Sequence, residues 1–264
     1  MTKSILMCAP KHFAVEYEIN PWMHTDNPVQ LDLAGKQWQQ LYDIYSKKLG
    51  WDVQLIEPVE HLPDMVFTAN GALLYNGKVA LPNFRQPDRQ PETEKFKQWF
   101  SDQGYDQMFL PKYNFEGEGD ALIWNDILFA GYPWRTDKPS HREVADFLKI
   151  KTVSLQLADA RFYHLDTALT IIDDSTVALY PKAFTKEALS LVHQLVPHVI
   201  EANDEDAVAY GLNSMSDGKN IVVPEKANNL IKNYQHRGLQ VTTTPISEFQ
   251  KSGGGVKCLT LELR

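Results

Sequence analysis

The sequence repeats one pattern, a short turn between two apolar strands with a helical segment after it. Turn signals occur at Asn76-Gly77, Asn125-Asp126 and 173–175, and Asn-Gly between apolar runs is a strong hairpin signal. The predicted strands around these turns are 71–75, 78–81, 121–124, 127–130, 168–172 and 176–180, and the helices after them are 92–102, 140–148 and 185–195. A period of about 50 residues is typical of a pseudo-symmetric, propeller-like array of ββαβ units. Adjacent hairpins disfavour the main alternative, a doubly wound parallel sheet.

The segments between the repeats continue the same mixed pattern. Further strands are predicted at 4–9, 53–56, 65–68, 220–224, 240–243 and 257–263, and further helices at 29–49 and 226–236. We expect the helix at 140–148 to begin with Ser140 as its N-cap and Glu143 in the capping-box position. No Ser/Gly-rich, Pro-rich or charged linker divides the 264 residues. The sequence therefore predicts one α/β domain over residues 1–264.

Charge and composition exclude several classes of function. The formal net charge of −8 argues against a nucleic-acid partner, because the phosphate backbone needs clustered Lys and Arg. The same charge does not exclude a cationic substrate, which an acidic cleft would attract. No apolar stretch approaches the roughly 20 residues of a membrane span, and the first residues lack the apolar core of a signal peptide. Two cysteines make no disulfide framework, so we expect a cytoplasmic protein with free thiols.

Three consecutive glycines at 253–255 lead to Cys258 and an alternating apolar segment. Glycine permits positive φ and a close approach of the backbone, so the run predicts a tight turn at the mouth of a strand, where a substrate could reach a thiol. Cys258 is therefore a candidate nucleophile, whereas we expect Cys8, beside a predicted strand, to pack in the core. Two distant cysteines lack the spacing of a metal site, so no metal is expected.

Three polar clusters lie at the edges of apolar strands. They contain Asp64, Phe67 and Asn70; Glu116 and Asp120; and His164 and Asp166. Because the starts of equivalent strands in a repeat array converge at one end of its axis, we expect these side chains to meet Cys258. An imidazolium can stabilise a thiolate near neutral pH, and carboxylates around a thiolate suit a cationic substrate. A planar guanidinium with five N–H donors matches carboxylates in this way, with His164 moving protons to the leaving nitrogen and from water.

The motifs, taken in order, resemble those of the guanidino-group-modifying enzyme (pentein) superfamily. The matching motifs are Asp64-x-x-Phe67, Phe115-Glu116-Gly-x-Gly-Asp120, His164-x-Asp166 and Gly-Gly-Gly-x-x-Cys258. That superfamily includes arginine deiminases, dimethylarginine dimethylaminohydrolases and amidinotransferases. The resemblance implies a five-bladed α/β propeller of ββαβ units with pseudo-fivefold symmetry and a cofactor-free reaction.

Within the superfamily, segments 7–23, 63–70, 96–100, 161–167 and 257–261 resemble the arginine dihydrolase branch. The resemblance implies that Cys258 is the nucleophile, that His164 is the general acid–base, and that Glu116 and Asp166 grip the guanidinium. It implies that the amino-acid end of the substrate is bound by Asn20, Arg89 and Arg135. Asp64, Phe67 and Asp120 are expected at the substrate site with them.

Asn70 is a departure from the deiminase pattern. Deiminases and dimethylarginine dimethylaminohydrolases typically carry an Asp at this position, whereas the dihydrolase branch carries an Asn. Because an amide can bind a neutral ureido group better than an anion can, the resemblance implies a second hydrolysis, from arginine through citrulline to ornithine, CO2 and two molecules of ammonia.

Other functions are compatible with parts of the pattern. They are an arginine deiminase that stops at citrulline, a methylarginine hydrolase, an amidinotransferase, and a catalytically silent propeller that binds a partner. Asn70 counts against the methylarginine hydrolase, and the chain is short for an amidinotransferase. A silent propeller predicts a broken catalytic set, whereas Cys258, His164, Glu116 and Asp166 are all present. A homo-oligomer is compatible with the sequence but nothing in it specifies one.

Overall fold

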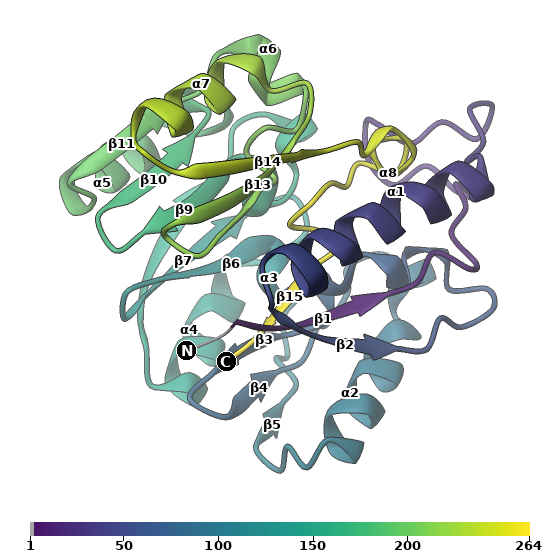
Figure 1. Ribbon diagram of the computed structural model, residues 1–264. Helices are drawn as coiled ribbons and strands as arrows, with labels where there is room; N and C mark the ends of the chain where they lie inside the picture. The colour runs from purple at the N-terminus through teal and green to yellow at the C-terminus, as the bar shows by residue number, and fades with distance from the viewer. Residues whose placement is uncertain (1–2) are drawn as a thin grey trace.

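The computed structural model describes residues 3–264, whose strands form five three-stranded sheets (Figure 1). In each sheet an antiparallel pair is followed by a helical crossover to a third, parallel strand. The strands, sheet by sheet, are β15 (Leu261–Leu263), β1 (Ser4–Cys8), β2 (Asp52–Ile56); β3 (Leu73–Tyr75), β4 (Lys78–Ala80), β5 (Met108–Phe109); β6 (Ala121–Trp124), β7 (Ile127–Tyr132), β8 (Lys151–Gln156); β9 (Leu169–Asp173), β10 (Thr176–Leu179), β11 (His198–Glu201); and β12 (Met215–Ser216), β13 (Asn220–Pro224), β14 (Gln240–Thr244). The ββαβ unit expected from the sequence is therefore present in every sheet.

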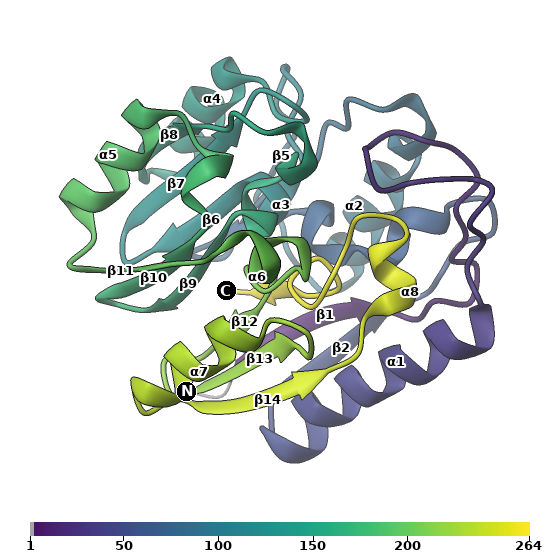
Figure 2. The same ribbon diagram turned by 90° about the horizontal axis from the view of Figure 1, so that it is seen from above.

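The crossover helices lie at the outside of the molecule, with the sheets toward its centre (Figures 1 and 2). They are α1 (Leu31–Asp43), α2 (Glu92–Asp102), α4 (Lys138–Leu148), α5 (Lys186–Leu195) and α7 (Asn228–His236), and the shorter helices are α3 (Gly117–Asp120), α6 (Asp204–Val208) and α8 (Ser247–Gln250). Helix α1 buries Ala34, Trp38 and Leu41, a spacing of three to four residues that places them on one face. Among residues 3–264, no helix is long and apolar enough to cross a membrane.

The first sheet is closed by both ends of the sequence. Strand β15 pairs antiparallel with β1, with Ser4 opposite Leu263, and β1 pairs in parallel with β2. Figure 1 accordingly places the two ends next to each other. Because Cys258 lies just before β15, this pairing fixes the position of the candidate nucleophile.

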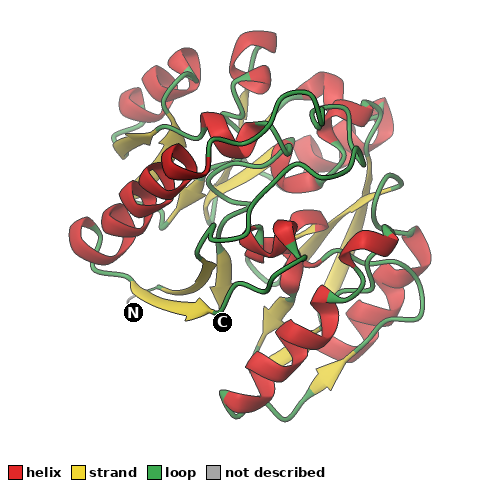
Figure 3. Ribbon diagram, turned by 90° about the vertical axis from the view of Figure 1, so that its right-hand side faces the viewer, coloured by secondary structure: helices red, strands yellow, loops and turns green. Residues whose placement is uncertain are grey.

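Edge strands of neighbouring sheets contact one another. Strand β15 contacts β3, and β9 contacts both β6 and β12. The segments that lead into these strands therefore approach the centre together, and loops cross the middle of the view in Figure 3. This is the arrangement that gathers residues distant in sequence into one site.

Several predicted elements are wrong in detail. Residues 65–68 are not a strand: Pro63–Val66 and Thr68–Gly71 form two 3-10 turns, and the Thr68 hydroxyl bonds to the Leu6 carbonyl at 2.9 Å. Helix α4 starts at Lys138 with Asp137 as N-cap, because Pro139 suits a first helical turn. Ser140 lies inside that turn, where its Oγ donates to the Asp137 carbonyl.

Candidate active site

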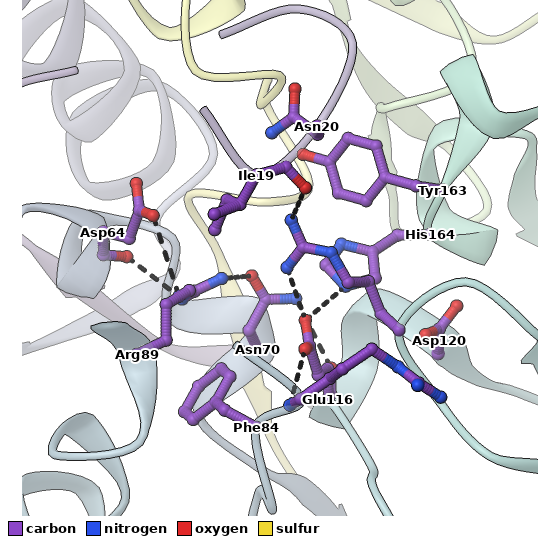
Figure 4. Close-up of polar contacts among 12 residues, drawn as sticks. Ile19, Asn20, Asp64, Asn70, Phe84, Arg89, Glu116, Asp120, Tyr163 and His164 are labelled. Carbon is purple, nitrogen blue, oxygen red and sulfur yellow. Dashed lines mark hydrogen bonds and ion pairs between the residues drawn. The ribbon is translucent and has the colours of Figure 1, made fainter. Parts of the chain in front are cut away.

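The predicted clusters meet around one narrow cavity. It is lined by Ile19, Asn20, Asp64, Phe67, Asn70, Arg89, Arg135, Tyr163, His164, Ser252, Gly253, Gly254 and Cys258. Many of these side chains surround one central space in Figure 4. Eight of the eleven predicted site residues line the cavity, and the remaining three, Glu116, Asp120 and Asp166, lie behind it.

The glycine run is required by three side chains that approach it. Gly253 has a φ of +79°, and a Cβ on it would lie 2.6 Å from the Tyr163 hydroxyl. A Cβ on Gly254 would lie 2.1 Å from the Phe67 ring, and one on Gly255 would lie 2.8 Å from Asn213 Oδ1. These distances exclude larger residues without rearrangement. The run therefore makes room for side chains of three other segments around the turn before Cys258.

Cys258 is buried between a hydrogen-bond donor and an acceptor. Asn213 Nδ2 donates to its Sγ at 3.1 Å, and the thiol donates to Asp166 Oδ2 at 3.3 Å. Burial and the neighbouring Asp166 carboxyl raise the pKa of the Cys258 thiol well above its usual value. Burial also raises the pKa of Asp166 to about 7. The sulfur is therefore a thiol in the ligand-free protein.

His164 and Glu116 form a buried pair next to the cavity. His164 Nε2 lies 2.8 Å from Glu116 Oε2. Burial lowers the pKa of His164 to about 4 despite this bond. Burial alone would raise the pKa of Glu116, but Arg135 and His164 outweigh it and lower the value to about 2. A carboxylate only accepts hydrogen bonds, so Nε2 carries the proton and Nδ1 is the basic nitrogen.

Cys258 and His164 are both neutral, which differs from one expectation of the sequence. The sequence predicts a thiolate stabilised by an imidazolium, but in the ligand-free protein Cys258 is protonated and His164 is neutral. Burial is the physical reason, because a desolvated site disfavours both charged forms. A positive charge brought next to the sulfur would therefore favour its ionisation.

Arg135 bridges the His164–Glu116 pair to the segment that contains Ile19. Its Nη1 donates to Glu116 Oε2 at 3.1 Å and its Nη2 to the Ile19 carbonyl at 3.1 Å. Its guanidinium lies 4.8 Å from the centre of the Tyr163 ring, and the Tyr163 hydroxyl donates to the Gly253 carbonyl at 2.8 Å. Figure 4 shows Glu116 at the middle of this network.

Arg89 occupies the opposite wall and is held by a carboxylate that the sequence analysis missed. Its Nε and Nη2 each donate to Glu92 at 2.8 Å, and its Nη1 donates to Asn70 Oδ1 at 2.9 Å. The guanidinium also lies 4.5 Å from the centre of the Phe84 ring. Glu92 sits at the start of helix α2, where a carboxylate is common for reasons unrelated to a site. No sequence signal therefore distinguished it.

The other polar residues of the wall are engaged by neighbouring loops. Asp64 accepts from the Tyr17 hydroxyl at 2.9 Å and from Ser252 Oγ at 3.1 Å. Asn20 Nδ2 donates to the Ser252 carbonyl at 3.1 Å. Asp120 accepts from the Leu165 backbone N–H at 3.0 Å, and burial raises its pKa well above the usual range. Asp120 therefore supports the backbone next to His164.

Sequence reasoning missed further residues at the site, namely Ile19, Tyr163, Ser252 and Asn213. Ile19, Tyr163 and Ser252 directly precede Asn20, His164 and the glycine run, and this adjacency was the one available signal. Over residues 3–264, no group of three or more His, Cys, Asp or Glu could hold a metal ion.

Known proteins with similar sequences include guanidino-group hydrolases. The family model for N,N dimethylarginine dimethylhydrolase, eukaryotic, matches residues 9–264. An N(G),N(G)-dimethylarginine dimethylaminohydrolase of Mycobacterium tuberculosis is 42% identical over 262 residues, 99% of this chain and 86% of that protein. The bifunctional arginine dihydrolase/ornithine cyclodeaminase AgrE of a Nostoc species is 40% identical over 265 residues, 98% of this chain but 37% of that protein.

A solved structure resembles the whole chain. The N-terminal domain of ArgZ, an arginine dihydrolase from the ornithine–ammonia cycle in cyanobacteria crystallised with product, gives a TM-score of 0.95 at 35% identity, covering 100% of this chain and 98% of that one. The mixed α/β fold is thus that of a known guanidino hydrolase. The chain belongs to the dimethylarginine dimethylaminohydrolase family of hydrolases, which act on guanidino carbon–nitrogen bonds.

Proposed function

We propose that this chain hydrolyses the guanidino group of free L-arginine twice, giving ornithine, CO2 and two molecules of ammonia. The observation that carries the proposal is the amide at residue 70. Its Oδ1 accepts from Arg89, and its Nδ2 lies 3.4 Å from the Glu116 carbonyl. The similarity to arginine dihydrolases of cyanobacteria over nearly all of this chain supports the same assignment.

The substrate itself would bring a positive charge next to the sulfur. A guanidinium beside Cys258 favours the thiolate, because an opposite charge within a few ångströms lowers the pKa of the thiol. The unprotonated Nδ1 of His164 is the base that would accept the proton. The carboxylates of Glu116 and Asp166 border the two reacting residues and would attract the cation.

The first cycle would convert arginine to citrulline. The thiolate attacks the guanidinium carbon, a carbon–sulfur bond forms, and ammonia leaves with a proton from the His164 imidazolium. Water that loses a proton to His164 then attacks the S-alkylthiouronium carbon, and the carbon–sulfur bond breaks. The thiolate is regenerated and the ureido group of citrulline remains bound.

The second cycle would use the same residues on a neutral group. The thiolate attacks the ureido carbon, ammonia leaves, and water hydrolyses the resulting thiocarbamate to a carbamate, which loses CO2. An amide at residue 70 offers N–H donors, whereas a carboxylate offers only acceptors. Asn70 therefore suits the ureido oxygen, which needs donors, better than an Asp would.

Product analysis tests the proposal. Incubation of the purified protein with arginine should give ornithine and ammonia in a ratio of one to two. Asn70→Asp should shift the products toward citrulline, and Asn233→Asp, an exposed change in helix α7, should leave the ratio unchanged. Stoichiometric citrulline from the unmodified protein would refute the second hydrolysis and leave an arginine deiminase.

A methylarginine hydrolase is the second candidate, because the matching family model and the 42% identical relative carry that name. It predicts release of dimethylamine from dimethylarginine at a rate well above ammonia release from arginine. Parallel assays with both substrates at equal concentration separate the two functions.

We also propose that the five sheets are the blades of a closed propeller with pseudo-fivefold symmetry, within one domain over 1–264. Their common ββαβ connectivity and the pairing of β15 with β1 support this arrangement.

A further inference from the structure

Asn213 is a fully buried residue that contacts the candidate nucleophile through both atoms of its amide. It lies in the turn between α6 and β12. The Cys258 backbone N–H donates to Asn213 Oδ1 at 3.0 Å, and Asn213 Nδ2 donates to Cys258 Sγ at 3.1 Å. Asn213 does not line the cavity, so its contact is with the reacting sulfur and not with the space a substrate would fill.

The orientation of the amide is fixed by its backbone partners. Oδ1 faces a backbone N–H, and Nδ2 also donates to the Asp166 carbonyl at 3.0 Å. A flipped amide would set a donor against the Cys258 N–H and an acceptor against that carbonyl. Nδ2 therefore carries one hydrogen for the carbonyl and one for the sulfur.

The backbone on both sides of Asn213 is tied as well. Its N–H donates to the Tyr210 carbonyl at 2.9 Å, and its carbonyl accepts from the Lys257 N–H at 3.3 Å. A Cβ on Gly255 would come within 2.8 Å of Asn213 Oδ1. The glycine is thus what allows the amide to reach the turn that carries Cys258.

We propose that Asn213 positions the Cys258 sulfur and stabilises its anion during the reaction. This inference rests on the proposed function only in taking Cys258 as the nucleophile. A hydrogen bond from a fixed donor to an ionised group is stronger than one to a neutral group, so the Asn213 amide favours the thiolate over the thiol. Among residues 3–264, it is the side chain that donates a hydrogen bond to this sulfur.

The Gly255 backbone N–H also lowers the pKa of the Cys258 thiol, whereas the other side chains around the sulfur do not provide the same stabilisation. The Asp166 carboxyl accepts from the thiol, and its charge opposes the anion. The Tyr163 and Tyr210 hydroxyls lie nearby, but Tyr163 donates to the Gly253 carbonyl, and the Tyr210 hydroxyl forms no hydrogen bond among residues 3–264. The Lys257 ammonium donates a hydrogen bond to Glu118 Oε2 at 2.6 Å and not to the sulfur.

Asn213→Asp keeps the oxygen that accepts from Cys258 N–H but places a carboxylate beside the sulfur, whereas Asn213→Leu removes the donor without adding a charge. The two variants are therefore compared. The rate of Cys258 alkylation by iodoacetamide is followed from pH 6 to 10 by mass spectrometry of the Cys258 peptide, which also separates it from Cys8. We expect alkylation at pH 8 to slow at least about tenfold and the profile to move to higher pH. The kcat for arginine should fall by a similar factor with little change in KM.

Gly255→Ala is a second variant, because its Cβ displaces the Asn213 oxygen while Asn213 itself remains. It should move the alkylation profile in the same direction, and Asn233→Asp should leave the profile unchanged. An Asn213→Asp protein with a normal melting temperature and the wild-type alkylation profile would overturn the inference. Cys258→Ser with normal turnover would instead overturn the proposed function.

Discussion

Asp166 should make the stability of the protein depend on pH in an unusual direction. Its carboxyl is fully buried, and its Oδ1 has no hydrogen-bond partner among the residues the structure describes. Burial raises its pKa from 3.8 to about 7. Between these two pH values the folded protein keeps the proton and the unfolded chain has lost it. This group therefore adds most stability below pH 3.8, and its contribution falls as the pH rises to about 7.

The size of this effect on the free energy of unfolding follows from the pKa shift of Asp166. The two pKa values differ by about three pH units, and at about 1.4 kcal/mol per unit the carboxylate costs about 4 kcal/mol of unfolding free energy above pH 7. Asn cannot ionise, so Asp166→Asn removes this cost. The variant should be up to about 4 kcal/mol more stable than wild type at pH 8 and near wild type at pH 4, although its turnover should fall.

Urea unfolding of both proteins from pH 4 to 8 measures this difference. Asp174→Asn, at an exposed position in the turn between β9 and β10, is the control and should track wild type across the range. A stability difference between Asp166→Asn and wild type that stays constant with pH would refute the reasoning, since it would mean that Asp166 is ionised throughout.

Four other substitutions distinguish effects on the reaction from effects on packing. Cys258→Ser should lower kcat by about 10³-fold or more with an unchanged melting temperature, as turnover and thermal unfolding assays would reveal. Glu116→Gln removes the anion between two buried cationic or basic partners and should destabilise the fold by about 3–5 kcal/mol in denaturant titrations. Gly254→Ala forces a Cβ toward Phe67 and should cost about 1–3 kcal/mol, whereas Gly35→Ala, in helix α1 with nothing within 4 Å of its Cβ, should stabilise by about 0.5–1 kcal/mol in the same measurement.

The fold could be predicted where local signals were strong. The turn at Asn76-Gly77 gives both its strands and their register, and α5 follows Thr185, its N-cap. Strands β5 and β12 have two residues each, and such short strands exist because of their neighbours and not because of their own sequence. The predicted strand at 65–68 failed because apolar residues in a buried 3-10 turn look like a strand.

The candidate site could likewise be predicted only where neighbouring residues in the sequence form a motif. Cys258 and His164 stand in recognisable motifs, and both line the cavity. Asn213 lies 45 residues from Cys258 in the chain within a segment that has no distinctive pattern. Its role depends on a contact between two turns, and only the folded structure brings those turns together. The neutral state of the thiol is likewise a result of burial, which residue types alone do not report.

The pairing of β15 with β1 joins residues separated by nearly the whole sequence, such as Ser4 and Leu263. Contacts of this separation close a long loop and slow the folding of the chains that depend on them. Because the turn that carries Cys258 leads directly into β15, partly folded molecules lack an aligned nucleophile. Alignment of the Cys258 turn therefore depends on a pairing that joins the two ends of the sequence.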